Sequence, residues 1–221
     1  MQTWFIDNAL YILVVIGTVF TFFWLWSFRD VLKLKTEVIA AISIAYSGLD
    51  AVCVKLFSVI EKFRLSAVNE MSLFGAIFFM PFAIWAIAKI CKVKPLLLFD
   101  ISVPGFLFMF ICGRINCLIT GCCYGLYMTQ SLRWPVREGE IALYLVLLII
   151  FGRRLKKGRF SGTLYPLFMI IYGIFRFAAE FVRWYPDQDG LWHRGHVCAV
   201  ISFIAGIIWL WVIKKRTLSA A

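Results

Sequence analysis

The stretch from Asn8 to Ser27, NALYILVVIGTVFTFFWLWS, contains no charged residue. A helix needs roughly 20 mainly apolar residues to cross the hydrocarbon core of a bilayer. The stretch is too long for the apolar part of a cleaved signal peptide and lacks a small-residue cleavage site. We therefore expect a retained membrane-spanning helix here.

Comparable runs recur along the 221 residues, of which 62% are hydrophobic. In a typical soluble domain roughly half of the residues are hydrophobic. We predict an all-α integral membrane protein, a bundle of about seven transmembrane helices forming a single transmembrane domain over residues 1–221. The predicted spans are Asn8–Ser27, Val38–Ile60, Met71–Ile90, Leu96–Ile119, Gly139–Gly152, Ser161–Phe181 and His196–Ile213.

The Lys and Arg residues between these spans predict the orientation. One set of alternate segments holds fourteen of them and the opposite set holds six. Because cytoplasmic loops are enriched in Lys and Arg, we place the N-terminus outside and the C-terminus in the cytoplasm. The net charge of +11 is spread over short loops, which indicates contact with anionic lipid and argues against nucleic acid as a partner.

Several ionisable residues lie within the predicted spans, where each costs roughly 2.5–3.5 kcal/mol on insertion scales. Four of them fall at one depth, near the outer end: Arg114, Glu140, Arg176 and Glu180. The i, i+4 spacing of Arg176 and Glu180 puts them on one helix face. Two arginines at this depth suit a phosphate, which a phospholipid headgroup supplies. The structural alternative is an ion pair that joins helices. For Asp100, near the inner end, capping or an interfacial position is the simpler interpretation.

The segment GRINCLITGCCYG, Gly113–Gly125, differs most from an ordinary span. Its glycines let the chain leave the helix and offer backbone N–H groups to a ligand. Its cysteines lack the C-x₂-C spacing of zinc sites and have no histidine close in sequence, so we predict no metal ligands and no cofactor. A thiol-redox or metal-handling role is nevertheless kept as an alternative.

Five segments from Met71 onward resemble, in order, the bacterial prolipoprotein diacylglyceryl transferase family. Met71–Ala76 resembles its M-S-F-H-G-G, Asp100–Pro104 its D-x-x-x-P, and Gly113–Gly125 its G-R-I-G-N-F-x-N-G-E-x-x-G. Pro135 and Glu140 fit its P-x-Q-x-Y-E. The most specific match is that of residues 172–183, YGIFRFAAEFVR, to Y-G-x-F-R-x-x-x-E-x-x-R.

The resemblance implies an enzyme of the bacterial inner membrane that moves diacylglyceryl from phosphatidylglycerol to the lipobox cysteine of a secreted prolipoprotein. A thioether forms and glycerol phosphate leaves. The catalytic residues expected are Arg114 and Arg176, which would hold phosphate, with Glu180, and with His196 as a candidate base. The substrate-binding residues expected are Gly113, Cys117, Gly121, Cys122, Gly125, Glu140, Tyr172 and Arg183.

The chain also departs from the family pattern. Phe74 replaces a histidine, Cys117 and Cys122 replace Asn and Glu, and Arg137 and Gly139 replace Gln and Tyr. Two interpretations therefore stay open beside the thiol one. The chain is a divergent transferase, or it is a non-catalytic paralogue that binds a phospholipid headgroup.

Overall fold

The computed structural model describes residues 2–185 and 192–218, and within them it is a bundle of helices without strands. Seven long helices occupy the seven predicted ranges: α1 (Gln2–Trp26), α3 (Thr36–Lys62), α4 (Leu73–Ile90), α5 (Pro95–Thr120), α6 (Val136–Lys156), α7 (Leu164–Glu180) and α8 (Arg194–Leu218). The short α2 (Arg29–Leu32) and the 3₁₀-helix η1 (Leu65–Asn69) lie in connections. Among the described helices, five are long and apolar enough to cross a membrane: α1, α3, α4, α5 and α8.

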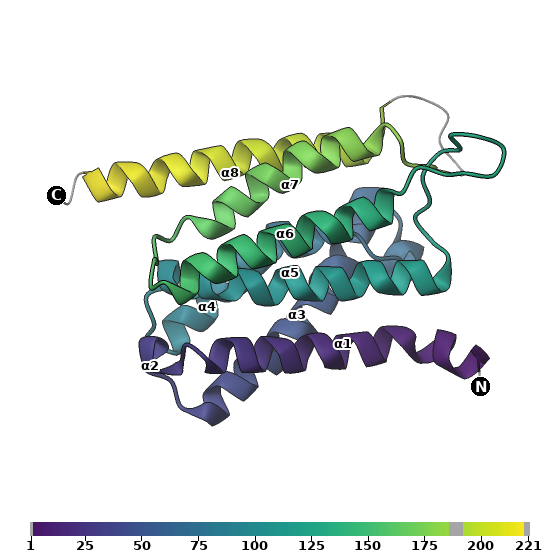
Figure 1. Cartoon of the computed structure of the whole chain (residues 1–221). Coiled ribbons are helices and arrows are strands. Elements are labelled where there is room, and N and C mark those ends of the chain that lie inside the picture. The colour runs from purple at the N-terminus through teal and green to yellow at the C-terminus, as the bar shows by residue number, and fades with distance from the viewer. Residues whose placement is uncertain (1, 186–191, 219–221) are drawn as a thin grey trace.

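Helix α5 is the centre of the bundle. In its most apolar window 78% of the residues are buried, against 22–39% in the other four apolar helices. It contacts α1, α4, α6 and α7, whereas α8 packs mainly on α7 (Figure 1). A polar side chain on α5 is therefore surrounded by protein and needs a partner from a neighbouring helix.

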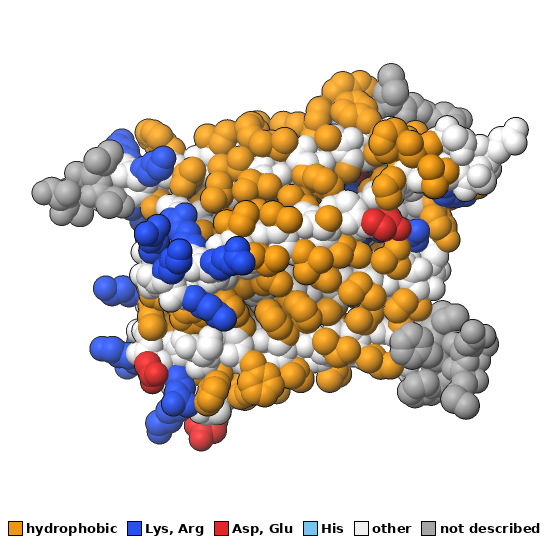
Figure 2. Space-filling model, in the orientation of Figure 1, with side chains coloured by type: hydrophobic (Ala, Val, Ile, Leu, Met, Phe, Trp, Pro, Cys, Tyr) orange, Lys and Arg blue, Asp and Glu red, His pale blue; other side chains and the backbone are white. Residues whose placement is uncertain are grey.

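The two ends of the bundle differ in charge. Figure 2 shows an apolar band with most of the visible Lys and Arg side chains gathered at the end that also carries the C-terminal part of the chain. The N-terminus lies at the opposite end in Figure 1. We call the basic end the inner end and the other the outer end.

Two local features differ from the sequence-based expectation. The Gly113–Gly125 segment stays helical as far as Thr120 and leaves the helix only at Gly121, whose φ of 68° is left-handed. The fifth predicted span, Gly139–Gly152, is the shortest of the seven, and its helix runs from Val136 to Lys156. Its basic last turn explains the extension, because cations are favourable at a helix C-terminus.

Candidate active site

The four ionisable residues predicted to share one depth are in direct contact. The carboxylate of Glu140 of α6 pairs with two arginines. It forms an ion pair with Arg114 of α5, and its Oε1 lies 2.5 Å from NH1 of Arg176 of α7. Arg176 also pairs with Glu180, one turn further along α7. The most exposed of the four residues, Arg114, is only 8% exposed. Three helices thus bring one buried charge network together.

A fifth side chain makes this network positively charged. NH1 of Arg183 lies 3.9 Å from Oε1 of Glu180. Three arginines and two glutamates carry a net charge of +1 when all are ionised. Buried ions are stable only when they are compensated, and an uncompensated charge in a low-dielectric site attracts an opposite one strongly. The network is therefore suited to hold an anion.

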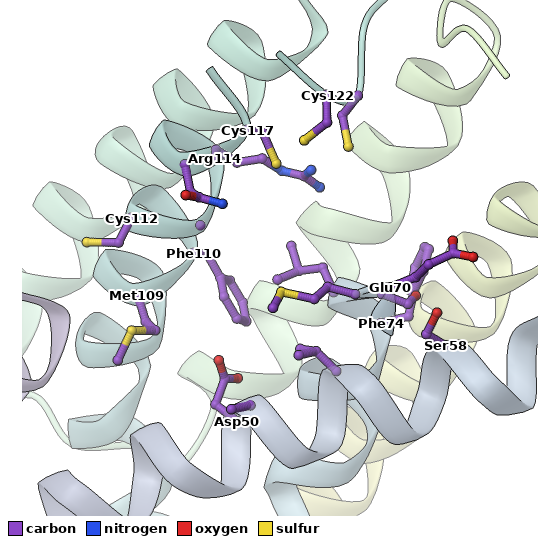
Figure 3. Close-up of a pocket in the computed structure, with 18 of the residues that line it drawn as sticks. Asp50, Ser58, Glu70, Phe74, Met109, Phe110, Cys112, Arg114, Cys117 and Cys122 are labelled. Atoms are coloured by element: carbon purple, nitrogen blue, oxygen red, sulfur yellow. The ribbon is translucent and has the colours of Figure 1, made fainter. Parts of the chain in front are cut away.

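The arginines face a cavity of about 570 Å³ that is lined by α1, α3, α4, α5 and α7. Arg114, Arg176 and Arg183 line it together with apolar side chains such as Leu13 and Phe110. Figure 3 shows Arg114 at one end of this cavity and Asp50 at the other, with Phe110 between them. One compartment thus offers an anion site and an apolar surface, as an amphiphile requires.

The loop after α5 fixes the outer ends of α5 and α7 relative to each other. The backbone N–H of Leu126 donates to the Val182 carbonyl at 2.8 Å, and that of Trp184 donates to the Tyr124 carbonyl at 2.9 Å. A Cβ on Gly125 would collide with the Trp134 backbone, so a side chain is excluded there. These contacts hold together the two helices that carry Arg114 and Arg176.

All the sequence-predicted site residues except His196 fall into three groups. Those that line the cavity are Gly113, Arg114, Cys117, Cys122, Tyr172, Arg176 and Arg183. Glu140 and Glu180 lie behind the arginines and hold them. Gly121 and Gly125 shape the loop.

His196 does not line the cavity. Its ring lies 4.5 Å from that of Phe181, 5.2 Å from that of Phe177 and 5.3 Å from that of Trp192, between centroids. Its Nδ1 accepts the backbone N–H of His193 at 3.1 Å. His196 therefore packs among aromatic rings, outside the set of residues that line the cavity with the arginines.

Sequence reasoning missed three contributors. Asp50 lies within the second predicted span, yet only the structure shows that it lines the cavity, where its Oδ1 has no hydrogen-bond partner among the described residues. The Tyr185 hydroxyl donates to Glu180 at 2.5 Å, and burial raises the pKa of this loop tyrosine. A Cβ on Gly195 would collide with the Glu180 carboxylate. Three sequence features could have indicated these residues. Asp50 is an acidic residue within a predicted span, Tyr185 follows Arg183 by two residues, and Gly195 stands at the start of a helix.

An ion-pair cluster at the outer rim of the cavity involves Lys62, Arg64 and Glu70. Glu70 pairs with Lys62, and its Oε1 accepts a hydrogen bond from Arg64 at 2.8 Å. The hydrogen bond from Lys62 is the largest cause of a lowered pKa at Glu70. These side chains are 38–57% exposed, so each pair stabilises the fold little.

Comparisons with known proteins identify one family. A family model described as prolipoprotein diacylglyceryl transferase matches residues 9–212. A phosphatidylglycerol–prolipoprotein diacylglyceryl transferase of Dehalococcoides mccartyi is 27% identical, with 91% of this chain and 86% of the relative aligned. A protein of the same name from Chlorobaculum tepidum is 30% identical over 70% of this chain and 60% of its own length.

Proposed function

This chain belongs to the prolipoprotein diacylglyceryl transferase family, and from that premise we propose that Arg114 and Arg176 hold the phosphate of phosphatidylglycerol while its diacylglyceryl group moves to a cysteine thiol. The acceptor is the lipobox cysteine of a secreted prolipoprotein. The observation that supports these roles is the pair of buried arginines that share Glu140 and line one amphiphilic cavity.

The reaction forms one carbon–sulfur bond, breaks one carbon–oxygen bond and releases the proton of the acceptor thiol. The sulfur of the acceptor bonds to the glyceryl carbon that carried the phosphate ester, and the carbon–oxygen bond breaks. Glycerol phosphate leaves with the bonding electrons, so negative charge develops on the leaving phosphate. Preorganised positive groups at such a position lower the barrier most, because they need no reorganisation during the reaction. Glu140 and Glu180 supply that preorganisation by fixing the arginines.

The placement in the membrane follows from the same helices. We propose that α6 and α7 also cross the bilayer, so that the chain has seven spans with its N-terminus outside. The positive-inside tendency supports this orientation, since the basic end holds the fourteen Lys and Arg residues of one set of loops. The arginine network then lies at the outer leaflet of the bacterial inner membrane, where secreted precursors emerge.

The decisive assay supplies phosphatidylglycerol, labelled in its diacylglyceryl part, and a lipobox peptide to the purified protein. The expected result is label on the peptide through a thioether, with release of glycerol phosphate. A peptide with serine in place of the cysteine is the matched control and should stay unlabelled.

The binding-only alternative has one specific observation in its favour: Phe74, which stands where the family has histidine, lines the cavity. The same assay separates the two functions. Saturable binding of phosphatidylglycerol without any labelled peptide would overturn the transferase proposal and leave a headgroup-binding protein.

A further inference from the structure

Three cysteines meet at the outer end of the cavity. The Sγ atoms of Cys117, Cys122 and Cys123 all lie within 4.8 Å of one another. All three residues line the cavity that Arg114 and Arg176 face. Figure 3 shows the Cys117 and Cys122 sulfurs at the same end as Arg114. None of the three is in a disulfide, so each thiol is available as a ligand.

The backbone is shaped to bring these thiols together. Gly121 ends α5 in the left-handed conformation, and the N–H of Cys122 donates back to the Cys117 carbonyl at 3.1 Å. Cys123 is itself left-handed, with φ of 57°. Arg137 then clamps the turn, because its NH1 donates to the carbonyls of Cys117 and Cys122, each at 3.2 Å. A left-handed non-glycine residue is unfavourable and persists only where its surroundings hold it.

We propose that Cys117, Cys122 and Cys123 bind one Zn²⁺, and that the acceptor cysteine thiol occupies the fourth coordination position. The second half of this proposal rests on the transferase function proposed above; the first half does not. It reverses the expectation drawn from the C-x₄-C-C spacing, because the Sγ distances decide whether thiols can share an ion.

The dimensions and the charge fit this ion. Zinc–sulfur bonds of about 2.3 Å in a tetrahedron place the sulfurs roughly 3.8 Å apart. The three sulfurs lie within 4.8 Å of one another, which is close to that spacing. Three thiolates and Zn²⁺ carry a net charge of −1, and this small negative charge lies at the same end of the cavity as Arg114 (Figure 3). A site with three protein ligands and one open position is the arrangement of catalytic zinc.

The metal would activate the acceptor thiol directly beside the arginines. Thiolate, not thiol, is the nucleophile, and a thiol that coordinates zinc loses its proton. No histidine is among the described residues that line the cavity. Asp50 lies at the far end (Figure 3), and Glu70 is engaged by Lys62 and Arg64. The remaining carboxylate in the lining is Glu61, in the last turn of α3.

The step balances without an oxidant or a further reactant. The acceptor thiol binds Zn²⁺ and releases its proton to water. Its sulfur then attacks the glyceryl carbon, the carbon–oxygen bond breaks, and glycerol phosphate leaves on the arginines. The product is a thioether, which is a weaker zinc ligand than a thiolate and so departs.

The test uses the full-length protein, reduced and stripped of metal in detergent, with Co²⁺ as a spectroscopic probe. The expected result is one Co²⁺ per chain with thiolate-to-cobalt charge-transfer absorption, displaced by Zn²⁺. Cys117→Ser, Cys122→Ser and Cys123→Ser should each weaken binding, on the order of tenfold or more for loss of one of three thiolates. Cys53→Ser and Cys91→Ser, outside the cluster, are the matched controls and should bind as the wild type does.

The acceptor is tested on the same cobalt protein. A lipobox peptide should shift the cobalt spectrum and its serine variant should not. Stripped enzyme should lose transfer and recover it with Zn²⁺. Absence of cobalt–thiolate absorption overturns the site, and transfer at the wild-type rate by metal-free protein overturns its role. Metal binding without any transfer leaves the site standing and refutes the transferase proposal instead.

Discussion

Helix α5 carries a buried charge at each end, and the two are held in different ways. At the inner end Asp100, fully buried, accepts the backbone N–H groups of Ser161, Gly162 and Leu164 at 2.6–2.9 Å. At the outer end Arg114 pairs with Glu140, which also holds Arg176. Asp100 is satisfied by main chain alone, whereas the outer arginines are satisfied by the side chains of Glu140 and Glu180 and themselves line a cavity.

The difference separates a structural charge from a functional one. Backbone donors at the start of α7 cannot leave without unfolding the turn, so Asp100 acts as a cap that joins α5 to α7. Side-chain ion pairs can exchange partners, and the outer network has one positive charge to spare. Burial is similar in the two regions, but only the outer arginines line a cavity. The groove beside the inner end of α5 is lined by Pro95, Leu96 and Phe99, and Asp100 is not among its lining residues.

The largest expected effect is on transfer, from changes in the outer arginines. Arg114→Ala and Arg176→Ala should each lower the transfer rate by on the order of 10²–10³-fold, since each removes a preorganised group for the leaving phosphate. Membrane insertion should persist, as checked by membrane fractionation. Arg154→Ala, which removes an arginine bonded to Ser161 at the inner end, is the control and should transfer normally. Wild-type transfer by both outer variants would refute the phosphate role and reduce this network to a structural one.

The next effect falls on stability, at the inner end. Asp100→Asn turns one carboxylate oxygen into an NH₂ group that faces N–H donors. We expect a loss of about 2–4 kcal/mol in the free energy of unfolding, because up to two buried N–H groups lose their acceptor. The transfer rate per folded molecule should not change. Denaturant titration and the assay, run on the same preparation, measure the two quantities. A large loss of transfer with unchanged stability would reverse the contrast between the ends.

A smaller effect distinguishes two glycines. A Cβ on Gly113 meets nothing within 4 Å, and Gly113 lines the cavity. Gly113→Leu should therefore fold normally and lower transfer by about tenfold, because the leucine side chain would occupy cavity volume that the lipid needs. At the inner end Gly162 has φ of 71°, and a Cβ would lie 2.7 Å from that of Leu96. Gly162→Ala should instead cost about 1–3 kcal/mol of stability and leave transfer per folded molecule unchanged. The opposite pattern in the two variants would contradict the assignment of the ends.

The smallest effect concerns the exposed ion pairs of Glu70 with Lys62 and Arg64, and how they depend on pH. The pKa of Glu70 is lower in the folded protein than its ordinary value of 4.5. Its stabilising contribution is therefore present above pH 4.5 and is lost as the pH falls through the folded pKa. We expect less than about 1 kcal/mol, since the pair is exposed. The difference in unfolding free energy between wild type and Glu70→Gln, followed against pH, should shrink below pH 4.5. A difference that grows there would contradict the sign.

Much of the fold could be read from the sequence. Hydropathy predicted the ranges of all seven long helices, because the length needed to cross a bilayer is a property of each segment alone. The i, i+4 spacing correctly predicted the Arg176–Glu180 pair, and a capping role was the simpler interpretation for Asp100. The residues that Asp100 caps lie some sixty positions later in the chain, and no local pattern could name them.

Sequence by itself determined that this protein is helical and apolar, which residues are charged within it, and that four of the charges share one depth. These are one-dimensional properties, set by composition and spacing along each helix. The tertiary structure decided the rest: that Glu140 pairs with two arginines, that Asp50 lines the same cavity, that His196 packs among aromatic rings outside the cavity lining, and that three cysteines meet. The physical reason is rotation about the helix axis, which packing against neighbours sets and which depth alone leaves open.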